Sequence, residues 1–466
     1  MGEVKRERNS FKGTIGFILA AAGSAVGLGN IWRFPYLAAK DGGGLFLVVY
    51  IALALTFGFC LLTTEIAIGR KTKQSALMAY GSLKKGWKPL GIVASAVTPI
   101  IFPYYCVIGG WVLKYFIVFL TGGGADAAAD GYFTGFITTQ IEPIVYMAIF
   151  LVIVAVLVFL GVKKGIESSS KILMPILIVL VVVIAVYSLT VRHTDADGAT
   201  RTGLEGLKIF VVPDFTDMTF GKFINVVIDA MGQLFFSLSV AMGIMITYGS
   251  YVSDEANLVK SIKQIEFFDT AVAFLAGAMI IPAVYTFMGQ EGLDASGPSL
   301  MFISLPKVFL SMGGVGRFIG TIFFLMVLFA AVTSAVSVME TVVSNIDDQF
   351  RIGRAKATLI ETLVGLALAV LVCFGYNLLY FDVVLPNGSH AQILDVMDYI
   401  SNNCLMPIVA IGTCILVGWV AGPKTVVDEL EKTGTKFKRR GLYVAMIKFV
   451  APVLLFILFL KSVGVF

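Results

Sequence analysis

Charged residues are scarce in this sequence, at 14% of 466 residues, whereas a soluble protein usually carries about a quarter. No polar stretch is long enough to form a separate soluble domain, so we expect a single domain over residues 1–466. Uncharged runs of about 20 residues recur from end to end, and each is long enough to cross a lipid bilayer. The net charge of +5 is spread over short loops, so we expect no nucleic acid partner.

Residues for catalysis and for binding transition metals are also sparse. The two histidines, His193 and His390, fall in or beside predicted loops, and the five cysteines show no CxxC spacing. The sequence has no Walker A lysine after a glycine run, no nucleophile elbow and no HExxH motif. ATP-driven transport and hydrolysis therefore lack support, and we expect neither an enzyme nor a histidine-based metal site.

The apolar runs predict an all-α polytopic membrane protein with eleven transmembrane helices. The predicted helices cover residues 13–38, 44–70, 90–120, 143–161, 168–191, 222–251, 261–290, 316–347, 357–377, 391–421 and 443–464. Lysine and arginine gather in the N-terminal segment and in alternate loops, which places these segments in the cytoplasm by the positive-inside rule. We therefore expect a multi-pass protein of the cell membrane (inner or plasma membrane), with a cytoplasmic N-terminus, an extracytoplasmic C-terminus and no cleavable signal peptide.

Three glycines within seven residues, Gly23, Gly27 and Gly29, interrupt the first predicted helix. Each weakens a helix by about 1 kcal/mol, and a backbone group freed in hydrocarbon costs several kcal/mol unless protein, water or a ligand binds it. The sixth predicted helix loses its pattern over residues 237–243. Since helices 1 and 6 lie five spans apart and cross in opposite directions, the two breaks predict a 5+5 inverted repeat with a binding site at mid-membrane. Its halves would be residues 13–191 and 222–421, with 443–464 as an extra helix 11.

Polar groups at membrane depth gather on the first, sixth, seventh and eighth predicted helices. They are Ser24, Asn30, Gln233, Ser237, Ser239, Asp269, Thr333, Ser334 and Ser337. Hydroxyl, amide and carbonyl oxygens together with a carboxylate suit a hard cation. A lone serine or threonine in a membrane helix often bonds its own backbone instead. An intramembrane aspartate such as Asp269 is costly, and it indicates a functional site.

Charged residues near the two membrane faces form two candidate pairs. Arg33 and Asp398 fall at comparable depth toward the outer face, and Arg8 and Asp348 fall near the cytoplasmic face. Each pair is a gate if it breaks in one conformational state only. The alternative for both pairs is a static interfacial contact, or side chains that reach toward the lipid headgroups.

At these residues the chain resembles the neurotransmitter:sodium symporter family, especially its bacterial amino-acid symporters of the leucine-transporter type. The similarity extends over about residues 5–465. It is carried by residues 22–35, 41–46, 104–105, 232–251, 329–334 and 394–398. The resemblance implies transport by alternating access, with two sodium sites, one substrate site and two gates.

The resemblance also assigns residues to these sites. It gives the first sodium site, which the substrate carboxylate completes, to Ala25, Asn30, Ser237 and Asp269. It gives the second sodium site to Gly23, Val26, Ala330, Thr333 and Ser334. It gives the substrate site to Ala25, Gly27, Leu28, Gly29, Ile101, Tyr105, Phe236, Ser237, Ser239, Met242, Ser334 and Val338. It gives the outer gate to Arg33 and Asp398, and the inner gate to Arg8, Ser250, Tyr251 and Asp348.

Departures from the family pattern bear on substrate and ions. Gly27 stands where monoamine transporters carry an aspartate for the amine, which favours an amino acid. Met242 replaces a common phenylalanine and adapts its shape to hydrophobic side chains, whereas Ala241 stands where glycine is frequent and narrows the pocket. Ala273 stands where chloride-dependent members carry serine, and Asp269 supplies a negative charge one turn earlier. We therefore expect Na⁺ as the coupling ion, with two sites, and no chloride.

The resulting expectation is sodium-coupled symport of a small, hydrophobic L-amino acid. One alternative is a proton-coupled amino-acid transporter that uses Asp269 as the carrier. A channel and a membrane-embedded amino-acid sensor are weaker alternatives, because the sequence predicts neither a continuous polar pore nor a signalling domain. The lipid bilayer and the amino acid are the expected partners. Dimers built on a twelfth helix are not expected, so a monomer is plausible.

Overall fold

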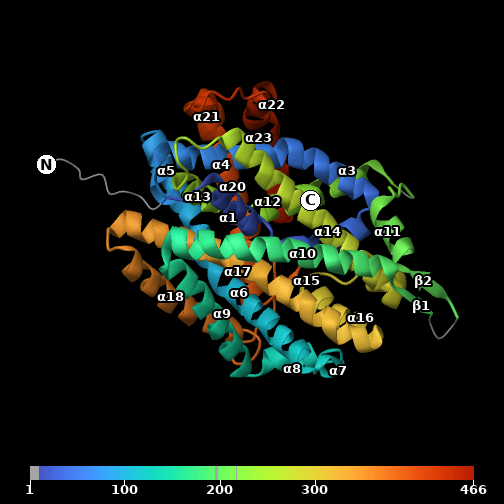
Figure 1. The fold of residues 1–466 in the computed structure, drawn as a ribbon. Coiled ribbons are helices and arrows are strands. Elements are labelled where there is room, and N and C mark those ends of the chain that lie inside the picture. The colour runs from blue at the N-terminus through green and yellow to red at the C-terminus, as the bar shows by residue number, and fades with distance from the viewer. Residues whose placement is uncertain (1–9, 195–197, 217, 466) are drawn as a thin grey trace.

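The computed structural model describes residues 10–194, 198–216 and 218–465, and it is almost entirely helical (Figure 1). Within these residues, nine helices are long and apolar enough to cross a membrane, and the count is ten when the bent pair at the start is taken as one span. The all-α membrane fold is therefore confirmed. The count of eleven and the division into two five-helix repeats stay predictions.

The longer helices follow the order of the predicted spans. They are α1 (Thr14–Ala25) with α2 (Phe34–Lys40), α3 (Gly44–Leu53) with α4 (Phe59–Thr72), α6 (Lys88–Thr121), α9 (Glu142–Phe159), α10 (Ser168–Thr190), α12 (Phe220–Ser237) with α13 (Ile244–Ser250), α14 (Leu258–Gly292), α17 (Gly316–Phe350), α18 (Arg354–Phe374), α19 (Ile393–Asp398) with α20 (Met406–Ile415), and α22 (Arg440–Ala445) with α23 (Ala451–Ser462).

Short elements connect these helices. The short helices are α5 (Ala76–Leu83), α7 (Gly124–Ala127), α8 (Tyr132–Thr138), α11 (Gly203–Val211), α15 (Gly297–Ser299), α16 (Leu305–Ser311) and α21 (Lys424–Glu431). Two antiparallel hairpins pair β1 (Arg192–Thr194) with β2 (Thr200–Thr202), and β3 (Val383–Val384) with β4 (His390–Ala391).

Both predicted helix breaks are present. The chain bends by 52° between Thr14–Ala25 and Gly29–Lys40, and a π-helical turn (Gly29–Arg33) leads into α2. The second break separates α12 from α13, and Ser239, Ala241 and Gly243 adopt positive φ angles of 53°, 63° and 79° there. A left-handed conformation costs a non-glycine residue roughly 1–2 kcal/mol. At Ala241 a buried side chain offsets part of this cost, because Glu65 Oε1 accepts the Ala241 amide proton at 2.5 Å.

The broken helices lie inside the bundle. Figure 1 places α1, α12 and α13 in its middle, and α1 packs directly on α10, α14 and α17. Backbone contact holds α13 on α4, because a methyl group added at Gly69 would lie 2.0 Å from the Ile246 carbonyl oxygen. At Gly249 an added methyl group would lie 2.4 Å from the Ile66 carbonyl oxygen. Only glycine permits such an approach, so the far side of the second break is anchored to a long helix.

Candidate binding site at the two helix breaks

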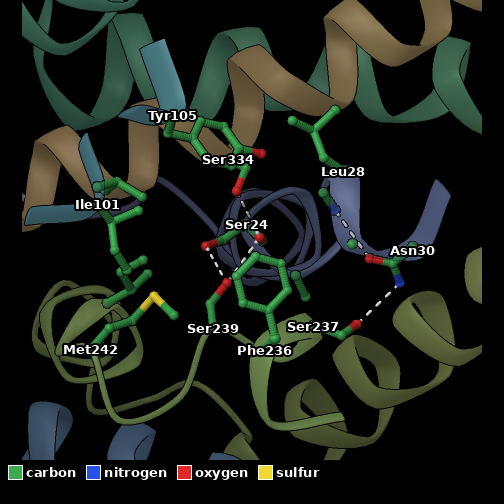
Figure 2. A pocket seen from close by; sticks show the side chains of 15 residues that line it. Ser24, Leu28, Asn30, Ile101, Tyr105, Phe236, Ser237, Ser239, Met242 and Ser334 are labelled. Atoms are coloured by element: carbon green, nitrogen blue, oxygen red, sulfur yellow. Dashed lines mark hydrogen bonds between the residues drawn. The ribbon is translucent and has the colours of Figure 1, made fainter. Parts of the chain in front are cut away.

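A cavity lies where the two breaks meet (Figure 2). Its lining residues come from α1 and the break after it, α6, α12 and the break after it, α13 and α17. They are Ser24, Ala25, Gly27, Leu28, Gly29, Asn30, Ile101, Tyr105, Phe236, Ser237, Ser239, Met242, Ile244, Ser334 and Val338. The structure thus gathers all the residues that the resemblance assigns to the substrate, and it adds Ser24, Asn30 and Ile244.

One end of the cavity offers a free hydroxyl donor. The Tyr105 hydroxyl is buried, and it has no hydrogen-bond partner within the described residues. A methyl group added at Gly27 would lie 3.4 Å both from this hydroxyl and from Ser334 Oγ, and Figure 2 shows the Tyr105 and Ser334 side chains on the same side of the cavity. A buried polar group without a partner costs about 1–3 kcal/mol. A ligand that accepts a hydrogen bond here would recover that cost.

A buried carboxylate, Asp269 of α14, lies next to this end. Its Oδ1 accepts hydrogen bonds from Asn30 Nδ2 at 2.9 Å and Ser237 Oγ at 2.6 Å. Its Oδ2 accepts one from the Tyr50 hydroxyl at 3.4 Å. Asn30 Oδ1 in turn accepts the Gly27 amide proton at 3.2 Å. Three side chains assigned to the first sodium site therefore meet in one network, and Ala25 lines the adjoining cavity.

The residues assigned to the second sodium site lie where the end of α1 packs against α17. A methyl group added at Gly23 would lie 3.2 Å from Thr333 Cβ, and Ser334 Oγ donates to the Ser24 carbonyl at 3.3 Å. Thr333 Oγ1 donates to the carbonyls of Phe329 and Ala330 within its own helix, at 3.0 and 3.1 Å. Val26, the remaining member, is fully buried. The site thus has carbonyl oxygens and two hydroxyls on facing helices, which are groups that suit Na⁺.

Side chains also tie the two breaks to each other. Ser239 Oγ donates to the Ser24 carbonyl at 2.9 Å, and Ser24 Oγ donates to Ser239 Oγ at 3.2 Å. Gln233 Nε2 donates to the Gly29 carbonyl at 3.1 Å. The Ser24 and Gly29 carbonyls near the first break are therefore satisfied by side chains of α12 and of the break after it. Such carbonyls are tolerated at membrane depth only where protein or a cavity satisfies them.

The two residues of the predicted outer gate, Arg33 and Asp398, have no direct contact. Arg33 lies in the electrostatic field of Asp398 and Asp229, but among the described residues no nitrogen–oxygen pair within 4.0 Å joins Arg33 to Asp398. Asp398 Oδ1 accepts hydrogen bonds from the Tyr104 hydroxyl at 3.0 Å and from Asn402 Nδ2 at 2.6 Å. The carboxylate is thus held in place near the cationic side chain.

Of the predicted inner gate, Arg8 lies outside the described residues. Asp348 Oδ2 accepts the Ser75 amide proton at 2.7 Å, and Ser250 Oγ donates to the Thr247 carbonyl at 2.6 Å. The Tyr251 hydroxyl donates to Glu340 Oε1 at 2.6 Å.

Three polar partners were missed by the sequence reasoning. Glu65 and Glu340 are fully or almost fully buried. Each is an acidic residue inside a predicted membrane helix, and this feature of the sequence could have identified them. Glu340 also accepts a hydrogen bond from Arg354 Nη1 at 2.9 Å. Tyr50 carried no signal, because nothing in its local sequence sets it apart from other tyrosines in apolar helices.

Comparisons with known proteins identify a matching family and similar proteins. A model of the sodium:neurotransmitter symporter family matches residues 8–125 and 137–466. An uncharacterised sodium-dependent transporter of Haemophilus influenzae is 31% identical over 478 residues, with 98% of each chain covered. Another from Bacillus subtilis is 32% identical over 460 residues, with 97% of each chain covered. The crystal structure of MhsT in complex with L-phenylalanine superposes with a TM-score of 0.84 at 33% identity, covering 98% of this chain and 100% of that one.

These findings confirm the resemblance seen in the sequence. The two bacterial relatives are described as sodium-dependent transporters and not as enzymes, which agrees with the missing catalytic motifs. The family model extends over both helix breaks and over α6, α13 and α17, which together build the cavity. The chain therefore belongs to the sodium:neurotransmitter symporter family and is a sodium-dependent membrane transporter.

Proposed function

We propose that this protein is a symporter that moves a hydrophobic L-amino acid together with Na⁺ by alternating access, without chloride. The observation that carries this proposal is the polarity of the cavity. An unpaired Tyr105 hydroxyl and the Asp269 network lie at one end, and the apolar side chains of Ile101, Met242 and Val338 also line it. Such a cavity suits a ligand with a polar, charged head and an apolar tail.

The polar end fits the α-carboxylate of an amino acid. The helical segment Gly29–Lys40 begins here, and the N-terminal end of a helix carries free amide groups and a partial positive charge. The Tyr105 hydroxyl supplies one further donor. The ammonium group would face carbonyl oxygens near Ala25 and Phe236, with Ser239 close by. The apolar walls then select a hydrophobic side chain, and L-phenylalanine in the related MhsT structure has this chemistry.

Sodium would bind next to the carboxylate and at a second position. In the first site the ion would take oxygens of Ala25, Asn30, Ser237 and Asp269, and the substrate carboxylate would complete the shell. Ion and substrate then stabilise each other, and this coupling is reciprocal. The second site would use Gly23, Val26, Ala330, Thr333 and Ser334.

The number of coupled ions decides how far the substrate accumulates. Each charge that crosses 100 mV contributes about 2.3 kcal/mol. Two sodium ions with a zwitterion give about 4.6 kcal/mol, or about a 2,000-fold concentration ratio before any sodium gradient, whereas one ion gives about 50-fold.

The hydrogen bonds of Asp269 favour chloride independence and sodium over protons. All three contacts of this carboxylate are accepted from donors, namely Tyr50, Asn30 and Ser237. The Asn30 Nδ2 group can only donate, which favours an unprotonated Oδ1 that faces the proposed sodium site. The donors Tyr50 and Ser237 are used by this fixed negative charge, so a chloride ion is not needed to balance sodium here. We further propose a monomer as the functional unit, with a cytoplasmic N-terminus and an extracytoplasmic C-terminus.

Uptake by proteoliposomes tests this proposal. A panel of radiolabelled amino acids is offered under an inward sodium gradient, then with potassium in place of sodium, and then with gluconate in place of chloride. We expect hydrophobic L-amino acids to accumulate only with sodium, at the same rate in gluconate. Accumulation driven by a pH gradient without sodium would support the proton-coupled alternative instead. Loss of uptake in gluconate would contradict chloride independence.

The size limit of the pocket is expected to depend on Ala241. Its left-handed φ of 63° is a conformation that glycine adopts freely. Ala241 does not line the cavity itself, but it directly precedes Met242, which does. Ala241→Gly relieves the backbone strain beside Met242, so larger substrate side chains should fit better. We expect L-tryptophan to gain about three- to tenfold over L-valine as a competitor of uptake, equivalent to about 0.7–1.4 kcal/mol. The matched control is Ala273→Gly in the regular helix α14, and an unchanged preference in Ala241→Gly would contradict this role.

A further inference from the structure

Two carboxylates and two ammonium groups meet where the ends of α2 and α23 lie beside the middle of α12. Asp229 of α12 accepts a hydrogen bond at Oδ2 from Lys40 Nζ at 2.8 Å, and its Oδ1 lies 3.7 Å from Lys461 Nζ. Asp41, which ends α2, has its Oδ1 4.0 Å from Lys40 Nζ. Lys461 also donates to Asn225 Oδ1 at 3.1 Å. Both lysines therefore pair with Asp229, and the negative charge of Asp41 is only weakly balanced by positive charge.

The second oxygen of Asp41 has no donor. Asp41 is only 7% exposed, and its Oδ2 is buried without a hydrogen-bond partner in the described part of the chain. Asp41 Oδ1 and Asp229 Oδ2 both lie within 4.0 Å of the same Lys40 Nζ, so the two carboxyl groups are neighbours. Burial, followed by the negative charge of Asp229, raises the pKa of Asp41 to about 6, against the opposing charges of Lys40 and Lys461. A shared proton satisfies both carboxyl groups, as in other pairs of close carboxylates.

The backbone directly after Asp41 is held in place. The following turn is clamped to the segment between α11 and α12, where Asp214 N donates to the Gly42 carbonyl at 3.0 Å and Gly43 forms a bridge with Pro213. A methyl group added at Gly43 would lie 2.0 Å from the Ile209 carbonyl oxygen. This segment packs against the turn through backbone groups, so the charged groups that face Asp41 are those of α2, α12 and α23.

The same cluster reaches the outer gate. Arg33 lies in the field of Asp398 on one side and Asp229 on the other. Its Nη2 is 3.4 Å from the position of a methyl group added at Gly232, three residues after Asp229 in α12. Within the described residues no ion pair shorter than 4.0 Å joins Arg33 to either carboxylate. The guanidinium is therefore placed between two competing negative charges.

We propose that Asp41 and Asp229 bind one proton between them and that this proton regulates the outer gate. With the proton bound, the pair carries one negative charge less, so Arg33 is drawn toward Asp398 and the gate closes. Without it, two ionised carboxylates draw Arg33 toward Asp229 and away from Asp398. The part of this proposal that concerns the gate rests on the proposed function, because that function makes Arg33 and Asp398 the outer gate. Acid outside the cell thus favours the closed gate.

Infrared difference spectroscopy on the purified full-length protein in lipid tests the shared proton. The spectra report the C=O stretch of protonated carboxyl groups between pH 5 and pH 8. We expect a band that titrates near pH 6 in the unmodified protein and in the control Asp126→Asn, which alters an exposed outer aspartate. The band should lose the intensity that comes from the pair in Asp41→Asn and in Asp229→Asn. A band of unchanged intensity in Asp41→Asn, or no band titrating near pH 6, would overturn the proposal.

Distances between spin labels test the movement of the gate in the absence of substrate. A negative result in this experiment is therefore distinguishable from a failure of the proposed transport function. Labels at Lys222→Cys, near the start of α12, and Asn387→Cys, in the hairpin before α19, report the approach of the two gate elements. Since one proton changes an equilibrium at most about tenfold per pH unit, we expect the closed population to rise about three- to tenfold from pH 7.5 to pH 5.5. Asp41→Asn should remove this dependence and Asp126→Asn should keep it. The same pH response in Asp41→Asn would overturn the regulatory link.

Discussion

Asp269→Asn is expected to raise the sodium concentration needed for half-maximal uptake about 100-fold, equivalent to about 2.7 kcal/mol. The carboxylate of Asp269 is buried among Asn30, Ser237 and Tyr50, and we propose that it binds the first sodium ion. Two unit charges at contact attract by about 4 kcal/mol even at an effective dielectric constant of 20. An asparagine keeps the size of the side chain but removes this attraction.

A sodium titration of uptake in proteoliposomes measures this effect. Glu361→Gln is the matched control, because it replaces another buried carboxyl group, in α18, that does not line the cavity. In Asp269→Asn the hydroxyl groups of Tyr50 and Ser237 lose their anionic acceptor, so chloride should restore part of the uptake that gluconate does not. An unchanged sodium dependence would remove Asp269 from the ion site.

Gly27→Asp is expected to abolish binding of L-phenylalanine, with a loss of at least about 100-fold. A methyl group at Gly27 would be in ordinary contact with Tyr105 and Ser334, at 3.4 Å from each hydroxyl oxygen. The new carboxylate would therefore project into the polar end of the cavity, where it would repel the α-carboxylate of the substrate. Phenethylamine, which lacks that carboxylate, should bind better than it does to the unmodified protein.

Equilibrium binding of both ligands to purified protein checks this prediction. Gly27→Asn is the matched control, since it adds a side chain of the same size without the charge. If Gly27→Asp and Gly27→Asn bind L-phenylalanine equally well, the substrate carboxylate does not lie at Gly27. That outcome would require a different orientation of the amino acid in the cavity.

Features written in local sequence were predictable. Glycines at residues 23, 27 and 29 inside an apolar run predicted the first break, and the structure places a bend of 52° there. Asp269 was singled out because a carboxylate inside an apolar helix is costly, and it lies at the centre of a hydrogen-bond network. The residues assigned to the substrate by resemblance all line one cavity, although their roles stay predictions.

Features that depend on tertiary contact were not predictable from one sequence. Glu65 bonds the Ala241 amide across 176 residues of chain, and the meeting of α4 with α13 depends on backbone contact at Gly69 and Gly249. The left-handed conformation of Ala241 runs against the preference of an alanine. The hydrogen bond from its amide to Glu65 helps to hold it. Likewise, Asp41 and Asp229 come together only because the end of α2 lies beside the middle of α12, where Lys40 contacts both carboxylates.

The central claim is that sodium and the amino-acid carboxylate share one site. Calorimetric titration of L-phenylalanine into the purified protein, over a series of sodium concentrations at constant ionic strength, tests it most directly. We expect the Kd for L-phenylalanine to fall as sodium rises, the sodium affinity to rise by the same factor when L-phenylalanine is bound, and phenethylamine to show no such coupling. A Kd for L-phenylalanine that does not change with sodium would contradict the account.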